Sequence, residues 1–156
     1  MCVKCAKIVH NRFKLLRATW HMQTAIHQIS PALSHGFDGF IDFLRDQETG
    51  ASTLSPKRFG EALSIDVQTL ATQAHVHRNT ISRTPASESV QKFLRESLRV
   101  IRAAHDLSGD VSRAIFWYRN EPLPPFGYKT AEQLVSEGRT EDVLRYVGSF
   151  EAGAAG

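Results

Sequence analysis

The stretch LATQAHVHRNTISR, residues 70–83, decides the fold. It begins as an amphipathic helix, breaks, and continues as a second, shorter helix. Ala71 is small enough to let the two helices approach closely, while Val76 and Ile81 are apolar and can hold the second helix against the first. This pattern predicts a helix-turn-helix in which His75 occupies the turn position that needs a left-handed backbone.

The second helix of this pattern carries the surface of interest, because the chain has no Asp or Glu from residue 67 to residue 87. In a helix-turn-helix, the start of the second helix enters the major groove, where Arg pairs with guanine and Asn with adenine. We expect DNA contacts from Gln73, His77, Arg78, Asn79, Thr80, Ser82 and Arg83, with Gln73, Thr80 and Ser82 on phosphates. The alternative is a three-helix packing unit without a role in DNA binding.

Upstream of this stretch, the sequence contains further helix signals. Ser55-Pro56 is an N-cap followed by proline in the first turn, and Asp66 can cap the helix that enters the opening stretch. FDGFIDFLRD (residues 37–46) has the i, i+3, i+4, i+7 apolar spacing of a short amphipathic helix. We interpret it as a helix that covers the core; the alternative is a segment that docks on a partner. The polar stretch ETGASTLS (residues 48–55) predicts a linker.

The basic character of the chain is concentrated at its start. Residues 1–21 contain five of the 19 Lys and Arg and none of the 16 Asp and Glu, which leaves 14 basic and 16 acidic residues elsewhere. The net charge of +3 therefore says little about the folded part. We expect residues 1–54 to be a partly disordered N-terminal extension, and Met22 is an alternative start of the protein.

The N-terminal segment also contains an isolated C-x-x-C pair, Cys2 and Cys5. A structural zinc site needs four ligands, and the positions of His10 and His21 match no zinc pattern. A redox motif would need a βαβ context, which the sequence lacks. We interpret the pair as incidental and expect no metal site and no cofactor; a small redox or zinc protein is the alternative.

The composition is that of an ordinary globular protein, with 42% apolar and 22% charged residues. No apolar run approaches the roughly 18 residues of a transmembrane helix, and residues 1–21 lack the apolar core of a secretory signal. We therefore expect a cytoplasmic protein that contacts no membrane.

Downstream, SESVQKFLRESLRVIRAAHDLSG (residues 87–109) predicts a long helix with a broad apolar stripe, ended by Gly109. Its opposite face mixes arginines with glutamates and should be solvated. Asp110 can cap a following helix that contains FWY (residues 116–118). Three consecutive side chains cannot share one helix face, so at least one aromatic should point outward. A Pro/Gly loop, a short helix capped by Thr130 and a last helix from about residue 140 complete the chain.

The order of these C-terminal features resembles the toxin-binding domain of the Xre/ParS/MbcA-type antitoxins, which are partners of RES-domain toxins. The matching residues are Ala114, Trp117, Asn120, Glu121, Pro122, Leu123, Phe126, Gly127, Thr130, Leu134, Gly138 and Val143. With the helix-turn-helix in front, the resemblance covers residues 55–150. Ala131 departs from the pattern, because many relatives have proline there.

The resemblance implies an all-α protein, with an Xre-like helix-turn-helix bundle joined by a long helix to a small helical toxin-binding domain. The regions would be 55–86 for DNA binding, 87–150 for toxin binding and 151–156 as a flexible tail. Such a protein would be a homodimer that represses its own operon and occludes a NAD-consuming RES-type toxin, without catalysis of its own. We expect toxin contacts from Trp117, Tyr118, Phe126, Leu134, Arg139, Tyr146, Phe150 and Glu151.

The main alternative is a stand-alone helix-turn-helix transcription regulator whose C-terminal half only dimerises. The two hypotheses differ in the neighbouring reading frame, because only the antitoxin requires an adjacent RES-type toxin gene.

Overall fold

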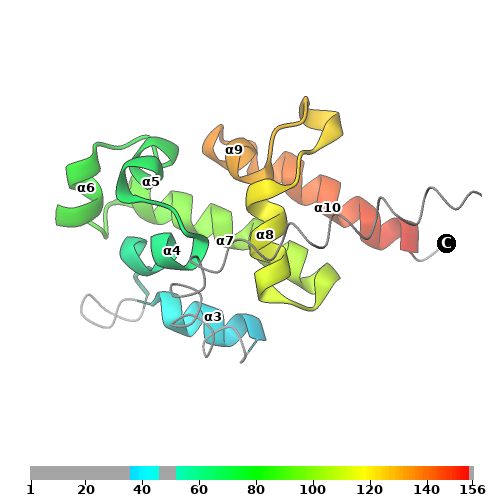
Figure 1. The fold of residues 1–156 in the computed structure, drawn as a ribbon, viewed down its shortest axis with the longest axis horizontal. Coiled ribbons are helices and arrows are strands. Elements are labelled where there is room, and N and C mark those ends of the chain that lie inside the picture. Colours follow the sequence, from blue (N-terminus) through cyan, green and yellow to red (C-terminus); the bar gives the residue numbers. More distant parts are fainter. Residues whose placement is uncertain (1–35, 46–51, 155–156) are drawn as a thin grey trace, which may run out of the picture. The chain divides into compact units, whose positions relative to one another are not determined.

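The computed structural model describes residues 36–45 and 52–154, with side chains described up to Phe150. These residues form helices joined by turns, with two isolated bridges and no strand, which confirms the predicted all-α class. The helices are α3 (Gly36–Leu44), α4 (Pro56–Leu63), α5 (Val67–Gln73), α6 (Arg78–Arg83), α7 (Glu88–Ser108), α8 (Val111–Asn120), the 3-10 turn η3 (Pro124–Phe126), α9 (Ala131–Ser136) and α10 (Thr140–Ala154) (Figure 1). The predictions for the remaining residues, Cys2, Cys5 and Met22 included, lie outside the described part of the chain.

The predicted capping residues occupy the N-caps of four helices. The side chain of Ser55 accepts a hydrogen bond from the amide of Arg58, that of Asp66 from Gln68 and Thr69, that of Asp110 from Arg113 and that of Thr130 from Gln133. Each cap satisfies amides that have no partner within the helix. At the C-terminal end of α7, Gly109 takes the left-handed conformation that was expected for a residue that ends the helix.

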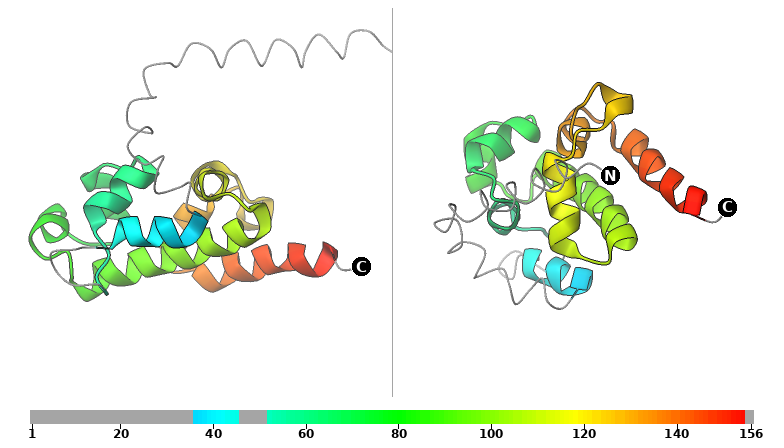
Figure 2. Two further views of the ribbon diagram at one scale, coloured as in Figure 1. Left: turned by 90° about the horizontal axis from the view of Figure 1, so that it is seen from below. Right: turned by 45° about the vertical axis from the view of Figure 1, so that its right-hand side comes forward.

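Helix α7 is the central element, and α4, α8, α9 and α10 all contact it (Figure 2). Its predicted apolar stripe is buried at Val90, Phe93, Leu94, Leu98, Ile101 and Ala104. The last member, Leu107, is instead 45% exposed. Ser97 and Val100 are also buried, because helices pack on more than one side of α7.

Helix α3 belongs to the core. Phe37, Phe40 and Leu44 are buried in the same cluster as the residues of α7, which confirms that FDGFIDFLRD covers the core. Arg58 of α4 closes the end of α3, since its guanidinium donates to the carbonyl oxygens of Phe43 and Arg45 at 3.0 and 2.9 Å.

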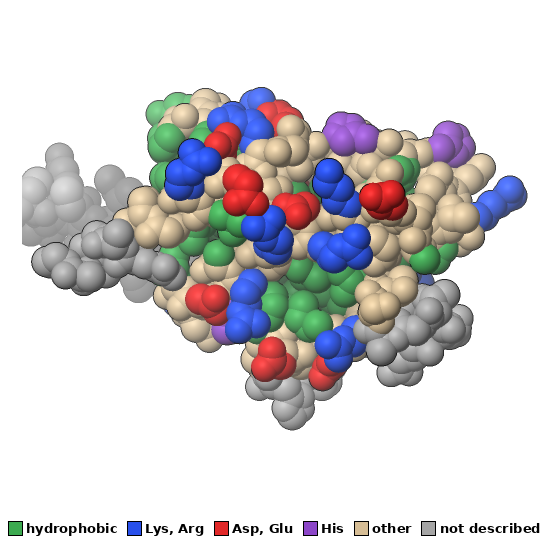
Figure 3. Space-filling view, turned by 180° about the vertical axis from the view of Figure 1, so that it is seen from behind, with side chains coloured by type: hydrophobic (Ala, Val, Ile, Leu, Met, Phe, Trp, Pro, Cys, Tyr) green, Lys and Arg blue, Asp and Glu red, His purple; other side chains and the backbone are tan. Residues whose placement is uncertain are grey.

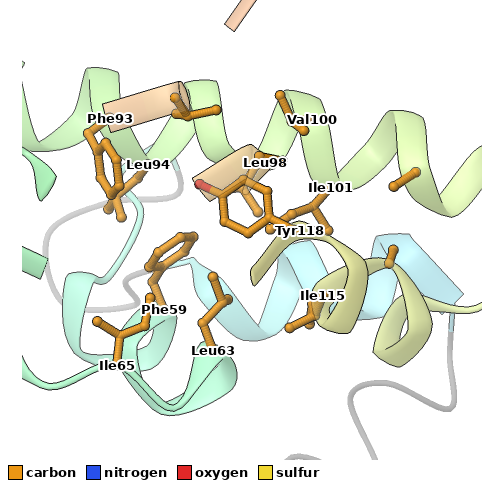
Figure 4. Packing of buried hydrophobic residues seen from close by; sticks show 14 of the residues in the cluster. Phe59, Leu63, Ile65, Phe93, Leu94, Leu98, Val100, Ile101, Ile115 and Tyr118 are labelled. Carbon is orange, nitrogen blue, oxygen red and sulfur yellow. The ribbon is translucent and has the colours of Figure 1, made fainter. Parts of the chain in front are cut away.

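The two predicted regions, 55–86 and 87–150, share this core. The described residues from Gly36 to Ala154 belong to one compact unit. Figure 4 shows Phe59 and Leu63 of α4 facing α7, with Tyr118 of α8 beside them. The rings of Phe59 and Phe93 meet edge-on at 6.4 Å between centroids. The region that resembles a toxin-binding domain is therefore packed directly against the helix that begins the predicted DNA-binding region.

A buried amide holds the segments on either side of helices α4 to α6. Gln91 of α7 is 5% exposed. Its Nε2 donates to the carbonyl oxygens of Leu54 and Pro85 at 2.8 and 2.9 Å, and its Oε1 accepts from the amide of Leu54 at 3.0 Å. One side chain thus fixes the chain before α4 and after α6, so residue 54 is anchored even though the sequence suggested a linker there.

The end of the chain differs from the expectation of a tail that starts at residue 151, because α10 continues to Ala154. The rings of Tyr146 and Phe150 pack edge-on at 4.9 Å between centroids, one helical turn apart. Such an i, i+4 aromatic pair stabilises the last turns of a helix in spite of Gly148. Among the described residues, no helix combines the length and the apolarity that crossing a membrane requires.

Candidate nucleic-acid and protein interfaces

Helices α5 and α6 are two short helices joined by a tight turn. Ile81 of α6 is buried, as are Leu70 and Ala71 of α5. His75 in the turn has a φ of 54°, the left-handed conformation predicted for it. Its Nε2 lies 2.7 Å from the carbonyl oxygen of Ser136 in α9, so this hydrogen bond helps to hold the unusual backbone.

The outer surface of α6 is polar and contains no carboxylate. Arg78, Asn79, Ser82 and Arg83 are exposed, and Thr80 is half-buried. Arg78 with Ser82, and Asn79 with Arg83, are each four residues apart and therefore lie on one side of the helix. Within the described part of the chain, neither Arg78 nor Arg83 has an ion-pair partner. The helix thus presents two unpaired cations and an amide to solvent.

Two of the predicted DNA contacts are placed differently. His77 is exposed, but it is the N-cap of α6, and its Nδ1 accepts from the amide of Asn79 at 3.2 Å. The main-chain carbonyl oxygen of Gln73 accepts a hydrogen bond from the hydroxyl of Ser136 in α9 at 3.0 Å. The side-chain oxygen of Gln73 is buried and lines a cleft of about 400 Å³ between α5, α7 and α9. We correct the prediction for Gln73, because the packing of α5 on α9 takes it away from the α6 surface.

Tyr118 and Leu134, two of the predicted partner contacts, belong to the core and have no exposed surface. The hydroxyl of Tyr118 donates to Ser97 Oγ at 2.9 Å, and Ser97 Oγ donates to the carbonyl oxygen of Phe93 at 2.9 Å. Burial raises the pKa of the Tyr118 phenol well above its usual range. The prediction is corrected for both residues, because α8 and α9 turn these side chains toward α7 and the core.

Four other predicted partner contacts form one partly exposed series, which we call the aromatic row: Phe126, Arg139, Tyr146 and Phe150. Phe126 and Tyr146 are half-buried against the core, whereas Arg139 and Phe150 are exposed. The guanidinium of Arg139 lies 5.1 Å from the ring centroid of Phe126. Phe126 meets Tyr146 edge-on at 5.8 Å, and Tyr146 meets Phe150 in the same way. Phe150 is 50% exposed at the end of the row. The side chain of Glu151 lies outside the described part.

A groove of about 200 Å³ begins where the aromatic row ends. Its lining residues are Ala104, Leu107, Ser108, Arg113, Ala114, Trp117, Val147 and Phe150. Phe116 stands beside it on α8 and is 64% exposed. The expectation that one of the three consecutive aromatics points outward is therefore confirmed, with Phe116 outside, Trp117 half-buried in the groove and Tyr118 inside. Leu107 and Arg113 line this groove but were not among the predicted partner contacts. The sequence signal for Leu107 was its place as the last residue of the apolar stripe, just before Gly109.

The back face of the molecule shows a third kind of surface. Figure 3 shows positive and negative side chains interspersed around an apolar patch. Arg99 pairs with Glu96 at 3.0 Å and with Glu141 at 2.8 Å, and Arg102 pairs with Asp106 at 3.2 Å. The arginines on this face are paired with carboxylates, which agrees with the solvated face predicted for α7. Such a mixture of charges favours neither an anionic nor a cationic ligand.

Arg119 and Glu132, which the sequence did not mark, join three helices in the interior. The guanidinium of Arg119 in α8 donates to the carbonyl oxygen of Leu63 at the end of α4. Its Nε lies 3.5 Å from Oε1 of Glu132 in α9, which is long for a hydrogen bond but short enough for an ion pair. Glu132 is 9% exposed. A charged pair of this kind gives no periodic signal, so only the structure reveals it.

The described residues contain no group of three His, Cys, Asp or Glu side chains that could hold a metal ion. Comparison of the chain with known proteins gives no match to a family model, to a curated protein or to a solved structure.

Proposed function

We propose that this protein is an antitoxin that binds operator DNA through α6 and covers a protein toxin with its C-terminal half. The observation that carries the proposal is the presence of two surfaces of opposite chemistry, one on α6 and one that runs along α10 to the groove at the end of α7. The surface of α6 is polar and free of carboxylates, whereas the aromatic row and the groove expose apolar rings. The 21 residues of α7 rise by about 31 Å, and this length separates α6 from the groove at the other end of the helix.

The α6 surface suits DNA because of the groups it exposes. Arg78 and Arg83 can pair with guanine edges or phosphates, and Asn79 can pair with adenine. The absence of Asp and Glu from residues 67 to 87 removes the repulsion that phosphates would otherwise meet at this surface. With only six residues, α6 can place few side chains in the groove, so two copies of the protein would be needed for a specific site.

The aromatic row suits a protein partner. Exposed apolar patches on a folded protein mark interaction sites, and aromatic residues and Arg are enriched in interface cores. Phe126, Tyr146 and Phe150 provide rings in a continuous series, and Arg139, which is paired with Asp142 at 2.9 Å, adds a guanidinium at one end. A toxin covered in this way would be silenced by occlusion, which requires no chemistry from the antitoxin. The resemblance to partners of RES-domain toxins makes a NAD-consuming toxin the expected target.

The proposal is tested by co-expression with the protein encoded next to this chain. The toxin alone should arrest growth, and the full chain should restore it and co-purify with the toxin. Tyr146→Ala should weaken rescue, because it removes the central ring of the row. Arg145→Ala is the matched control on the same helix, since this side chain is 77% exposed and only makes a 3.7 Å pair with Asp142. Growth rescue by neither the wild type nor any variant, with the chain folded, would contradict the antitoxin proposal.

The groove supports a second candidate, a stand-alone regulator whose C-terminal half only dimerises. An apolar groove at the end of α7 is a surface through which two copies could join. Binding of the chain to its own upstream DNA, together with no binding to the adjacent gene product, would favour this candidate.

A further inference from the structure

The turn between α5 and α6 is tied to the end of α9 by two hydrogen bonds that run in opposite directions. The Nε2–H of His75 donates to the carbonyl oxygen of Ser136 at 2.7 Å, and the hydroxyl of Ser136 donates to the carbonyl oxygen of Gln73 at 3.0 Å. The cleft of about 400 Å³ between α5, α7 and α9 lies beside these bonds. The two bonds therefore cross a contact that side chains do not fill.

His75 gives this turn two alternative backbone states. Its φ of 54° lies in the left-handed region, which costs free energy for a residue that has a Cβ atom. The bond to Ser136 offsets this cost, so loss of the bond favours a return of His75 to a right-handed or extended backbone. Because α6 begins only three residues later, at Arg78, a change in this φ would re-orient α6.

The other side of this contact is fixed to the aromatic row. Helix α9 ends with two hydrogen bonds around Gly138: its own amide and the amide of Arg139 donate to carbonyl oxygens of α9 at 2.9 and 2.8 Å. This closed helix end holds Arg139, whose guanidinium lies over the ring of Phe126, in a fixed place relative to Ser136. A displacement of Arg139 therefore acts on the bond between Ser136 and His75.

We propose that α9 positions helix α6 through His75, so that a change at the aromatic row alters the orientation of α6. The turn is the element with two states, and the bond to Ser136 selects one of them. One consequence rests on the proposed function: a partner bound to the aromatic row would change the affinity of α6 for DNA. Couplings between two sites typically amount to factors of roughly 5 to 150, and DNA must change the affinity for the partner by the same factor.

Hydrogen exchange of the full chain tests the link without DNA or a partner. The probe is the amide of Thr84, which donates to the carbonyl oxygen of Thr80 at 3.0 Å at the end of α6. A helix of six residues is not stable by itself, so this bond reports how well α6 is held. His75→Gly permits the left-handed backbone and removes the bond to α9. It should raise the exchange rate of Thr84 about fivefold relative to amides in the middle of α7, the factor expected for the loss of one hydrogen bond.

Strain applied at the far end of α9 distinguishes a link from a local effect. Gly138 has a φ of 76°, and a Cβ added there meets no described atom within 4 Å, so Gly138→Ala strains only the backbone. It should speed the exchange of Thr84 in the wild type but not in His75→Gly, where the bond that transmits the strain is absent. Gly109→Ala at the end of α7 is the matched control, because Gly109 has a φ of 69° and equally open surroundings but makes no bond to the turn.

Equal exchange of Thr84 in the wild type and His75→Gly would overturn the proposal, and so would an effect of Gly138→Ala that is the same in both backgrounds. In a wild type that binds its upstream DNA, the protein encoded next to this chain should change the affinity for DNA, and His75→Gly should abolish that change. A change of equal size in His75→Gly would also overturn the proposal. Exchange that responds as expected in a chain that binds no DNA would support the link while the DNA-binding half of the proposed function fails.

Discussion

The α5–α6 end and the α8–α10 end of the molecule share one core but differ in the kind of side chain that they expose to solvent. At the first end the apolar residues Leu70, Ala71 and Ile81 are buried, and what reaches solvent on α6 is charged or polar. At the second end Leu107, Phe116 and Phe150 remain between 45% and 64% exposed. A polar, cationic surface suits a polyanion, and an apolar one suits a protein. The difference shows how one small core can offer two unlike ligands separate faces.

The largest expected effect comes from removing one end, because the two ends share a core. A fragment that starts at Ser87 would lose α3 to α6 and expose the side of α7 that Phe59 and Leu63 cover. The predicted boundary between regions 55–86 and 87–150 would allow such a fragment to fold and bind a partner by itself, whereas the shared core leads us to expect loss of cooperative unfolding. Thermal denaturation should show a broad or absent transition. A fragment that starts at Gly36, where the described part of the chain begins, is the control and should melt cooperatively. A sharp transition in the Ser87 fragment would establish two independent domains.

A single substitution can weaken the contact of α8 with α4 and α9, which connects the two ends. Arg119→Ala leaves Glu132 without its ion-pair partner inside the protein and removes a hydrogen bond to the end of α4. We expect the free energy of unfolding to fall by about 3 kcal/mol, because an unpaired buried carboxylate is costly. Urea denaturation measures this loss. Adding Glu132→Gln should restore part of it, and no recovery in the double variant would argue against the charge as the cause.

Substitutions on α6 should weaken DNA binding and leave the stability of the fold unchanged. Arg83→Ala and Asn79→Ala should each cost about 1–3 kcal/mol of specific binding to the chain's own upstream region if a base contact is lost. Their unfolding free energies should stay within about 0.5 kcal/mol of the wild type, because both side chains are exposed. Mobility-shift titration at fixed salt gives the affinities. Lys57→Ala, an exposed cation on α4, is the control; an equal loss in that variant would indicate non-specific attraction instead of base contacts.

The smallest expected effect concerns the core that both ends share. Tyr118→Phe removes the hydrogen bond to Ser97 and should lower the free energy of unfolding by about 1 kcal/mol at neutral pH. The pKa of Tyr118 is raised by burial, so the folded chain keeps a proton that the unfolded chain releases above pH of about 10. This contribution to stability is complete below that pH and falls by about 1.4 kcal/mol per pH unit above it. Urea denaturation between pH 9 and pH 11 should show a shallower decline in Tyr118→Phe; identical slopes would contradict the assignment.

The sequence was a good guide wherever a local signal exists. Ser55, Asp66, Asp110 and Thr130 each cap the predicted helix, and the left-handed backbone at His75 was expected from its place in the turn. These features depend on a few neighbouring residues, so they can be recognised without knowledge of the tertiary packing.

The candidate surfaces were harder to predict, because exposure depends on which helices meet. Leu134 matches the resemblance as well as Trp117 and Phe126 do, yet only the packing of α9 decides that it is buried, and the packing of α8 does the same for Tyr118. Leu107 fits the apolar stripe of α7, but no helix of the described part of the chain buries it. A one-dimensional pattern gives the spacing of side chains on one helix and not the identity of the neighbouring helix.

The buried amide of Gln91 has a consequence for hydrogen exchange. The amide of Leu54 lies outside every helix, and amides in such segments ordinarily exchange with solvent quickly. Here its hydrogen is donated to Gln91 Oε1, so the exchange rate of Leu54 should follow the opening of this junction. A single protected amide in an irregular segment would thus report when the chain before α4 and after α6 detaches from α7, well before the whole molecule unfolds.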